Sequence, residues 1–379
     1  MRPAFEVADV LKRHWPLVLN DKRFNLWQIR TLGAIMRCRS ADLGGHKDIC
    51  CNCGNSRISY NSCRNRHCPK CQGKNRENWI ENRENDLIPV PYFHVVFTLP
   101  DILNHLALFN PEAVYNSLFD AAWNTIKVFA NDPKHLGAKT GMIAVLHTWG
   151  QNLSLHPHLH CIVPGGGLSA AGFWKYARNN GKYLFPVKAM SMVFRAKYAA
   201  ALRMKFPDID KNFMDSLFDQ HWVVYAKRPF GNPHQIIEYL GRYTHKIAIS
   251  NHRILNIDQH CVTFSYKDYR KGAKKLEMTL PVNEFIRRFA LHILPKAFVR
   301  IRHYGILSSS TKHLTIPHIK QLLVYLESPF EKSFTTDIFN PKYCPNCKTD
   351  SMITVEIFHK RGPPDVLNSI IKSNHFILS

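Results

Sequence analysis

The stretch that decides the fold is His156-Pro157-His158-Leu159-His160-Cys161-Ile162-Val163. Read as a β-strand, it directs alternate side chains to opposite faces of a sheet. His158, His160 and Ile162 then share one face, and the residues between them pack away from it. Two imidazoles on one face can bind a single divalent metal ion. The stretch therefore predicts a strand that carries a metal site on one face.

A second interpretation of the same stretch is a histidine triad, His156-x-His158-x-His160. Nucleotide hydrolases with that pattern use a histidine nucleophile and no metal. Such a hydrolase would not need the positive charge, the clustered cysteines or the paired tyrosines described below. We therefore expect His158 and His160 to be metal ligands and His156 to be a neighbour.

The metal site needs a third ligand, because two histidines leave it underfilled. A strand is predicted over residues 142–149, and a short loop makes it the hairpin partner of the histidine strand. Two candidates lie on this partner or at its end: His147 through a ring nitrogen and Gln151 through its carbonyl oxygen. We slightly favour Gln151 because it lies at the mouth of the hairpin.

The net charge of the chain indicates the kind of partner that it binds. The 379 residues include 51 Lys and Arg against 28 Asp and Glu, a formal net charge of +23 and a pI near 9.6. Nucleic acid is the commonest polyanion that such an excess matches. A hydrophobic fraction of 45% excludes a disordered chain. No signal pattern or membrane-length apolar run is present, so we expect a cytoplasmic protein without a membrane partner.

Clustered cysteines indicate zinc rather than disulfides in such a protein. Cys50-x-x-Cys53 and Cys68-x-x-Cys71 are separated by 14 residues, which is typical of one tetrahedral structural site. Four further residues of suitable type lie near these two pairs: Cys38, His46, Cys63 and His67. If alternate ligand pairs along the chain share an ion, these four residues bind a second zinc ion in a cross-braced arrangement. A last pair, Cys344 and Cys347, has no obvious partner, although His359 is available.

Two basic segments are candidate DNA contacts. The cysteine-rich module carries Arg64, Arg66 and Lys70. Residues 283–304 interleave cations with aromatic rings, which suits single-stranded nucleic acid, and the candidate contacts there are Arg287, Arg288, Arg300 and Arg302. The alternative for this second segment is a cationic helix face that covers a core.

A pair of tyrosines supplies candidate nucleophiles. Asn232 and Pro233 form a sound helix start, and Tyr239 and Tyr243 follow it four residues apart, on one helix face. By themselves they fit two core tyrosines. Beside a two-histidine metal site in a basic protein, they fit nucleophiles that attack a phosphate.

The remaining periodicity predicts both helices and strands. Helical spacing extends over residues 1–36, 101–130 and 188–206. Further strands are predicted over residues 92–99, 222–225, 247–250 and 262–266.

Taken together, these motifs resemble the insertion-sequence-91 type transposases, rolling-circle enzymes of the HUH (His-hydrophobic-His) class with two tyrosines. The resemblance covers residues 35–310 and is carried by five segments: residues 63–71, 147–151, 156–160, 239–245 and 285–289. It implies an α+β fold, with an antiparallel sheet palm flanked by helices and a small zinc-binding N-terminal module. It also implies Mg²⁺ or Mn²⁺ at the histidines, and nicking of single-stranded DNA at transposon ends and target through a 5′-phosphotyrosine.

The expected domain order follows from the same resemblance. A helical lead-in (1–36) precedes a zinc-binding, DNA-contacting module (37–86), the two-tyrosine nuclease domain (87–310) and a C-terminal tail (311–379). Two alternatives stay open. A plasmid replication initiator or relaxase uses the same chemistry, and a non-catalytic zinc-dependent protein would only bind DNA.

Overall fold

The computed structural model describes residues 3–72, 86–227, 247–268, 272–324 and 340–359. The chain divides into two compact units. The first combines Met1–Gln72, Ser250–Thr263 and Pro329–Ser379, and the second combines Gly73–Ile249 and Phe264–Ser328. Each unit is therefore built from separated stretches of sequence, whereas the expected domains follow one another along the chain.

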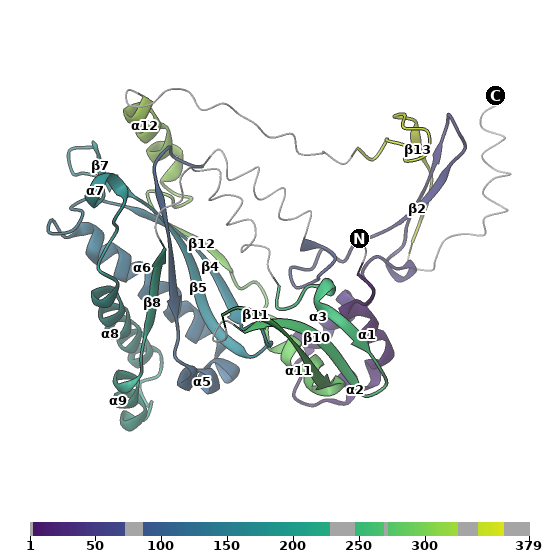
Figure 1. The fold of residues 1–379 in the computed structure, drawn as a ribbon, viewed down its shortest axis with the longest axis horizontal. Coiled ribbons are helices and arrows are strands. Elements are labelled where there is room, and N and C mark those ends of the chain that lie inside the picture. Colours follow the sequence, from purple (N-terminus) through teal and green to yellow (C-terminus); the bar gives the residue numbers. More distant parts are fainter. Residues whose placement is uncertain (1–2, 73–85, 228–246, 269–271, 325–339, 360–379) are drawn as a thin grey trace. The chain divides into compact units, whose positions relative to one another are not determined.

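A five-stranded sheet forms the centre of the described part of the second unit (Figure 1). Its order is β12-β4-β5-β3-β8, and all neighbours are antiparallel. The strands are β3 (Tyr92–Thr98), β4 (Gly141–Trp149), β5 (Leu155–Pro164), β8 (Val223–Lys227) and β12 (Ile301–Gly305). The predicted hairpin of β4 and β5 is confirmed, and so is the α+β fold.

Helices cover one face of this sheet. α6 (Pro111–Asn131) and α8 (Val187–Lys205) pack on the face to which Leu159, Cys161 and Val163 of β5 point, and these three residues are fully buried. α5 (Asn104–Phe109) and α9 (Lys211–Asp219) flank the two long helices. The alternation of β5 thus follows the pattern expected from its sequence.

A smaller apolar cluster covers part of the opposite face. Ile143 of β4 and Ile162 of β5 pack there with Ile319 of α12 (Lys312–Val324). His158 and His160 share this face with Ile162, because they alternate with it along β5. The apolar cluster and the histidines therefore lie on the same sheet face, at different positions along the strands.

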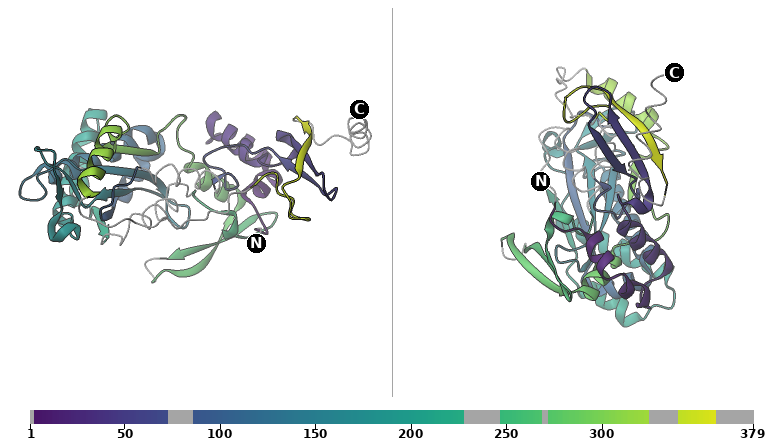
Figure 2. Two further views of the ribbon diagram at one scale, coloured as in Figure 1. Left: turned by 90° about the horizontal axis from the view of Figure 1, so that it is seen from above. Right: turned by 90° about the vertical axis from the view of Figure 1, so that its right-hand side faces the viewer.

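The first unit begins with α1 (Val7–Arg13), α2 (Trp15–Asn20) and α3 (Leu26–Met36), in agreement with the predicted helical lead-in. A three-stranded sheet of order β13-β1-β2 follows, made of β1 (Gly45–Cys50), β2 (Ser56–Tyr60) and β13 (Met352–Phe358). β13 is the yellow strand beside the purple β1–β2 hairpin in the right-hand view of Figure 2. A strand near the C-terminus thus completes a sheet begun near the N-terminus.

The remaining described elements are two smaller sheets, two helices and three 3₁₀ turns. A sheet of order β11-β10-β9 consists of β9 (Ile254–Ile257), β10 (Cys261–Asp268) and β11 (Lys274–Pro281), followed by α11 (Val282–Leu291). The division between the two units passes through β10. A small ribbon of β6 (Gly166–Leu168) and β7 (Trp174–Tyr176) precedes α7 (Arg178–Gly181). Single 3₁₀ turns are η1 (Ala41–Leu43), η2 (Asp101–Leu103) and η3 (Asn251–Arg253).

Two sequence predictions need correction. Residues 247–250 are not a strand: Ala248 and Ile249 are buried, and the Ser250 carbonyl accepts from the Arg253 amide in a 3₁₀ turn. The helical segment 101–130 is interrupted, because α5 ends before Asn110 and α6 begins at Pro111. Proline fits the first turn of a new helix and does not continue the preceding one.

Gly305 lies on β12, at the edge of the five-stranded sheet, and a substitution there tests how closely the backbone packs against its neighbours. It has a φ of +59°, and a Cβ there would clash with the Thr140 carbonyl oxygen and lie 2.8 Å from the ring of Trp123. We expect Gly305→Ala to lower the free energy of unfolding by about 3 kcal/mol or more, measured by urea titration. The matched control is Gly272→Ala, at φ +66° with no atom of the described residues within 4 Å, which costs only about 1 kcal/mol. Equal losses would contradict the close approach at Gly305.

Candidate metal and nuclease site

Three histidines converge on the face of the sheet that α6 and α8 do not cover. His147 on β4 lies directly opposite His158 on β5, and His160 follows two residues along the same strand. Directly opposite residues of an antiparallel pair share a face. Among the described residues, each of the three offers one ring nitrogen within 4.8 Å of the other two. This grouping has the donor set and spacing of a metal site.

Hydrogen bonds orient two of the rings. The Nδ1 atom of His158 lies 2.7 Å from the carbonyl oxygen of His156. A carbonyl only accepts, so Nδ1 carries the proton and Nε2 of the neutral ring keeps its lone pair. The Nδ1 atom of His160 lies 2.8 Å from Nε2 of His94 on β3. The Nε2 atoms of His158 and His160 are therefore the natural ligand atoms.

His94 was not predicted from the sequence. Burial, followed by the charge of Lys227, lowers the pKa of His94 to about 4, so its ring is neutral near pH 7. A neutral His94 can accept the Nδ1 proton of His160, the arrangement that supports metal-binding histidines. The only sign of this role in the sequence was a histidine within the apolar strand 92–99. Its side chain lies on the same sheet face as that of His160.

Ring contacts and hydrogen bonds hold His147 and the loop between β4 and β5 in place. The ring of Trp149 stacks on His147 at 4.6 Å, and the guanidinium of Arg300 lies 5.2 Å from the Trp149 ring. His292, at the end of α11, contacts the Thr148 hydroxyl and the Leu153 carbonyl, each at 3.2 Å. Burial lowers the pKa of His292 to about 4, so this anchor is neutral.

The two candidates for the third ligand are placed differently. His147 faces His158 across the hairpin, whereas Gln151 lies half-buried in the loop between β4 and β5. His156 lies outside the group of three, with its Nδ1 atom 3.9 Å from an Asp101 carboxylate oxygen. The strand register thus favours His147 over Gln151.

The predicted nucleophiles lie outside the described residues. Tyr239 and Tyr243, together with the helix start at Asn232, fall in residues 228–246. Their roles stay predictions.

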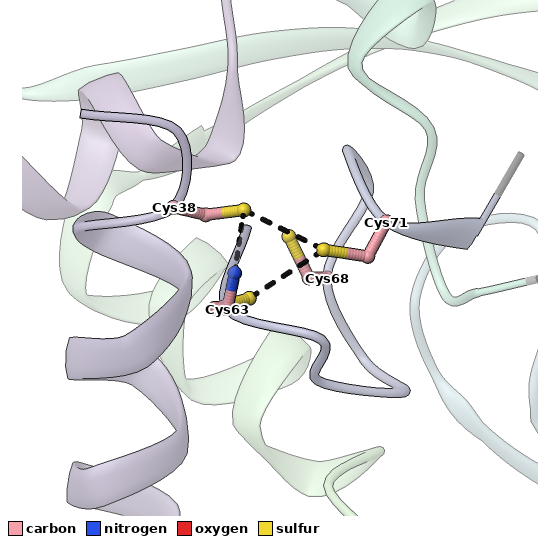
Figure 3. Close-up of side chains that lie close together, drawn as sticks. All are labelled: Cys38, Cys63, Cys68 and Cys71. Atoms are coloured by element: carbon pink, nitrogen blue, oxygen red, sulfur yellow. Dashed lines mark hydrogen bonds between the residues drawn. The ribbon is translucent and has the colours of Figure 1, made fainter. Parts of the chain in front are cut away.

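Eight cysteines form two groups of four, both drawn from the first unit. Figure 3 shows the first group, made of Cys38, Cys63, Cys68 and Cys71. The Sγ atom of Cys71 lies 3.5 Å from that of Cys38 and 3.7 Å from that of Cys63. A tetrahedral zinc ion with Zn–S bonds of about 2.3 Å holds its sulfurs about 3.8 Å apart, so the cluster fits zinc.

The second group joins Cys50 and Cys53 to Cys344 and Cys347. This corrects the predicted grouping of Cys50 and Cys53 with the Cys68 pair. Sequence spacing favoured the nearest pair, whereas the β1–β13 pairing brings up the distant Cys344 pair.

Neither predicted histidine belongs to a described metal group. His46 on β1 lies 3.5 Å from the Asp48 carboxylate, and Nε2 of His67 lies 3.3 Å from Nε of Arg66. Both clusters are instead completed by a fourth cysteine, so the prediction that His46 and His67 bind zinc is corrected.

Basic side chains of the cysteine-rich module differ in exposure. Arg64 is exposed at a φ of +51°. Lys70 forms an ion pair with Glu6 at 2.5 Å, and Arg66 is half-buried beside His67. Arg64 is therefore the freest of the three to meet a phosphate.

The second basic segment is largely engaged within the protein. Arg287 and Arg288 both bind Glu284, at 2.6 and 2.7 Å, and they lower the pKa of that carboxyl to about 2. Arg300 is buried and donates to the Leu146 carbonyl, and Arg302 lies 4.1 Å from the Phe119 ring centroid. These contacts favour the structural alternative for this segment, and its role in DNA binding stays a prediction.

No helix in the described part of the chain is long and apolar enough to cross a membrane.

Two family models match the chain. Residues 10–99 match a transposase zinc-binding domain, and residues 141–314 match a putative transposase family. The first match contains the Cys38 cluster and the Cys50 pair, and the second contains the three histidines. No solved structure matches the chain.

Curated relatives point the same way. The chain is 41% identical over 388 residues to the putative transposase y4qJ of Sinorhizobium fredii (strain NBRC 101917 / NGR234), covering 95% of this chain and 97% of the relative. It is 29% identical over 324 residues to the transposase for insertion sequence element IS801 of Pseudomonas savastanoi pv. phaseolicola, covering 82% and 77%. The chain therefore belongs to the insertion-sequence-91 type transposases, a family of DNA-processing enzymes with a zinc-binding domain.

Proposed function

We propose that this transposase nicks and rejoins single-stranded DNA at transposon ends and target through a metal-assisted tyrosine attack. The observation that carries the proposal is the convergence of His147, His158 and His160 on one face of an antiparallel sheet. Its setting is the cytoplasm, on DNA of the nucleoid.

The three histidines suit a divalent cation. The Nδ1–H group of His158 donates to a backbone carbonyl, so its Nε2 lone pair is free to bind a metal. The Nδ1–H group of His160 donates to Nε2 of His94, which leaves the Nε2 lone pair of His160 free in the same way. A site of three imidazoles fits Mn²⁺ better than Mg²⁺, which prefers oxygen ligands. When bound, the ion polarises the scissile phosphate and neutralises charge on its oxygens.

Tyr239 or Tyr243 supplies the nucleophile. Its hydroxyl oxygen forms a bond to phosphorus and loses its proton, while the bond from phosphorus to the 3′ oxygen breaks and that oxygen gains a proton. The products are a 5′-phosphotyrosine and a free 3′ hydroxyl. Attack of a 3′ hydroxyl on the phosphotyrosine reverses the step, so strands are rejoined without ATP. Two tyrosines allow two strands to be held at once.

Family membership favours a transposase over a replication initiator or relaxase with the same chemistry. The remaining alternative, a zinc-dependent protein that only binds DNA, differs in one observable, because it forms no covalent link to its substrate.

Removal of both tyrosines tests the chemistry. Full-length protein is incubated with Mn²⁺ and labelled single-stranded oligonucleotides that tile both ends of the element. We expect a denaturation-resistant protein–DNA adduct in the wild type and none in Tyr239→Phe/Tyr243→Phe, because phenylalanine has no hydroxyl nucleophile.

The matched control is Tyr183→Phe, a change at an exposed tyrosine outside the five-stranded sheet. It should leave the adduct yield unchanged. An adduct that survives the double change, or no wild-type adduct with any divalent metal, would overturn the proposal.

Metal affinity tests the ligand set independently of DNA. Mn²⁺ binding is measured by electron paramagnetic resonance titration of protein that keeps its cysteine-bound zinc and has been dialysed to remove zinc from the histidines. We expect His94→Phe to weaken binding about 10- to 100-fold, because it removes the hydrogen bond to His160 but no ligand. His147→Ala should weaken binding more, and Gln151→Ala should leave it unchanged. The reverse order for His147 and Gln151 would make Gln151 the third ligand.

Salt dependence tests the DNA-contacting role of Arg64. Each lost phosphate contact lowers the slope of log affinity against log salt by about 0.7 for single strands. We expect that reduction in Arg64→Asn, measured by fluorescence anisotropy, since asparagine tolerates the φ of +51°. Arg39→Asn is the control, because Arg39 is also exposed with a left-handed φ of 56°. An unchanged slope in Arg64→Asn would remove Arg64 from the DNA interface.

A further inference from the structure

We propose that Cys50, Cys53, Cys344 and Cys347 bind a second structural zinc ion, which fastens residues 340–359 to the N-terminal zinc-binding domain. The matched family regions end at residues 99 and 314, so neither contains Cys344 or Cys347. The site is independent of the proposed nuclease chemistry.

Sulfur geometry is the first argument. Cys50 and Cys347 have their Sγ atoms 3.5 Å apart, and Cys53 and Cys344 have theirs 3.7 Å apart. All four sulfurs lie within 4.8 Å of one another. These separations match the edge of about 3.8 Å expected for four thiolates around zinc, and they equal those of the Cys38 cluster.

The two Cys-x-x-Cys turns have the same backbone structure. The Gly54 amide donates to the Cys50 carbonyl at 2.9 Å, and the Lys348 amide donates to the Cys344 carbonyl at 3.0 Å. Gly54 and Lys348 both have left-handed φ values, of +69° and +63°. Equivalent turns from opposite ends of the chain thus present their cysteines to one point.

Hydrogen bonds also support the sulfurs. The hydroxyl of Ser351 lies 2.9 Å from Sγ of Cys50, and that of Thr349 lies 3.0 Å from Sγ of Cys347. The side-chain amide of Asn346 donates to Sγ of Cys53 at 3.5 Å. Such donors offset the negative charge of thiolates that bind a metal.

Packing alone gives this region little support. The apolar cluster here, among the described residues, contains Cys50, Cys344 and Met352 as its buried members, with Cys347 packed against it. β13 nevertheless pairs with β1 from Gly45↔Phe358 to Cys50↔Met352. A small module with so little core depends on its metal for folding. The zinc ion therefore holds the C-terminal strand in the N-terminal sheet.

Zinc content of the full-length protein tests this proposal. We expect Cys344→Ser/Cys347→Ser to hold one zinc ion per chain fewer than the wild type, measured by mass spectrometry of the metal. The control is Cys51→Ser, a change at an exposed cysteine outside both clusters, which should hold as many as the wild type. An equal zinc content in the double variant and the wild type would overturn the proposal.

Hydrogen exchange separates local release from general unfolding. In Cys344→Ser/Cys347→Ser, amides of β13 should lose protection while those of β4 and β5 keep it, because the five-stranded sheet has its own apolar core. Unchanged protection of β13 would contradict a fastening role for the metal. Neither measurement involves DNA cleavage, so these outcomes are distinct from those of the tyrosine test.

Discussion

The pairing of β4 with β5 is the contact on which the histidine cluster of the second unit depends. Its register sets His147 opposite His158 and leaves His160 within reach of His94 on the next strand. A shift of one residue would turn the histidines of β5 toward α6 and α8 and move Leu159 and Cys161 to the other face. Burial of those two residues against the helices therefore fixes the positions of the three histidines as well as the core.

The five-stranded sheet and the β13-β1-β2 sheet are stabilised by different interactions. The five-stranded sheet buries a large apolar cluster under α6 and α8, and its histidine face is held by packing and hydrogen bonds. The β13-β1-β2 sheet has a small apolar cluster and is flanked by four cysteines. Metal coordination in such a module replaces the burial that a short chain segment cannot provide.

The net positive charge of the chain and the individual basic side chains have different roles in this protein. The excess of +23 supports an anionic partner, in accord with the transposase family. Several cations nevertheless stabilise the fold: Glu284 binds two arginines, and Arg300 and Arg302 lie over aromatic rings. Interleaved arginines and rings in a sequence therefore do not by themselves identify a DNA-binding surface.

Local patterns in the sequence determined four of the five strands of the sheet that carries the histidines, the shared face of His158 and His160, and the presence of zinc-binding cysteines, whereas β12 was not predicted. These properties follow from periodicity and short spacing, which act between near neighbours. The tertiary structure decided which cysteines group together and that His94 contacts His160. Both depend on contacts between segments that are distant in sequence, and residue spacing carries no information about such contacts until the chain folds.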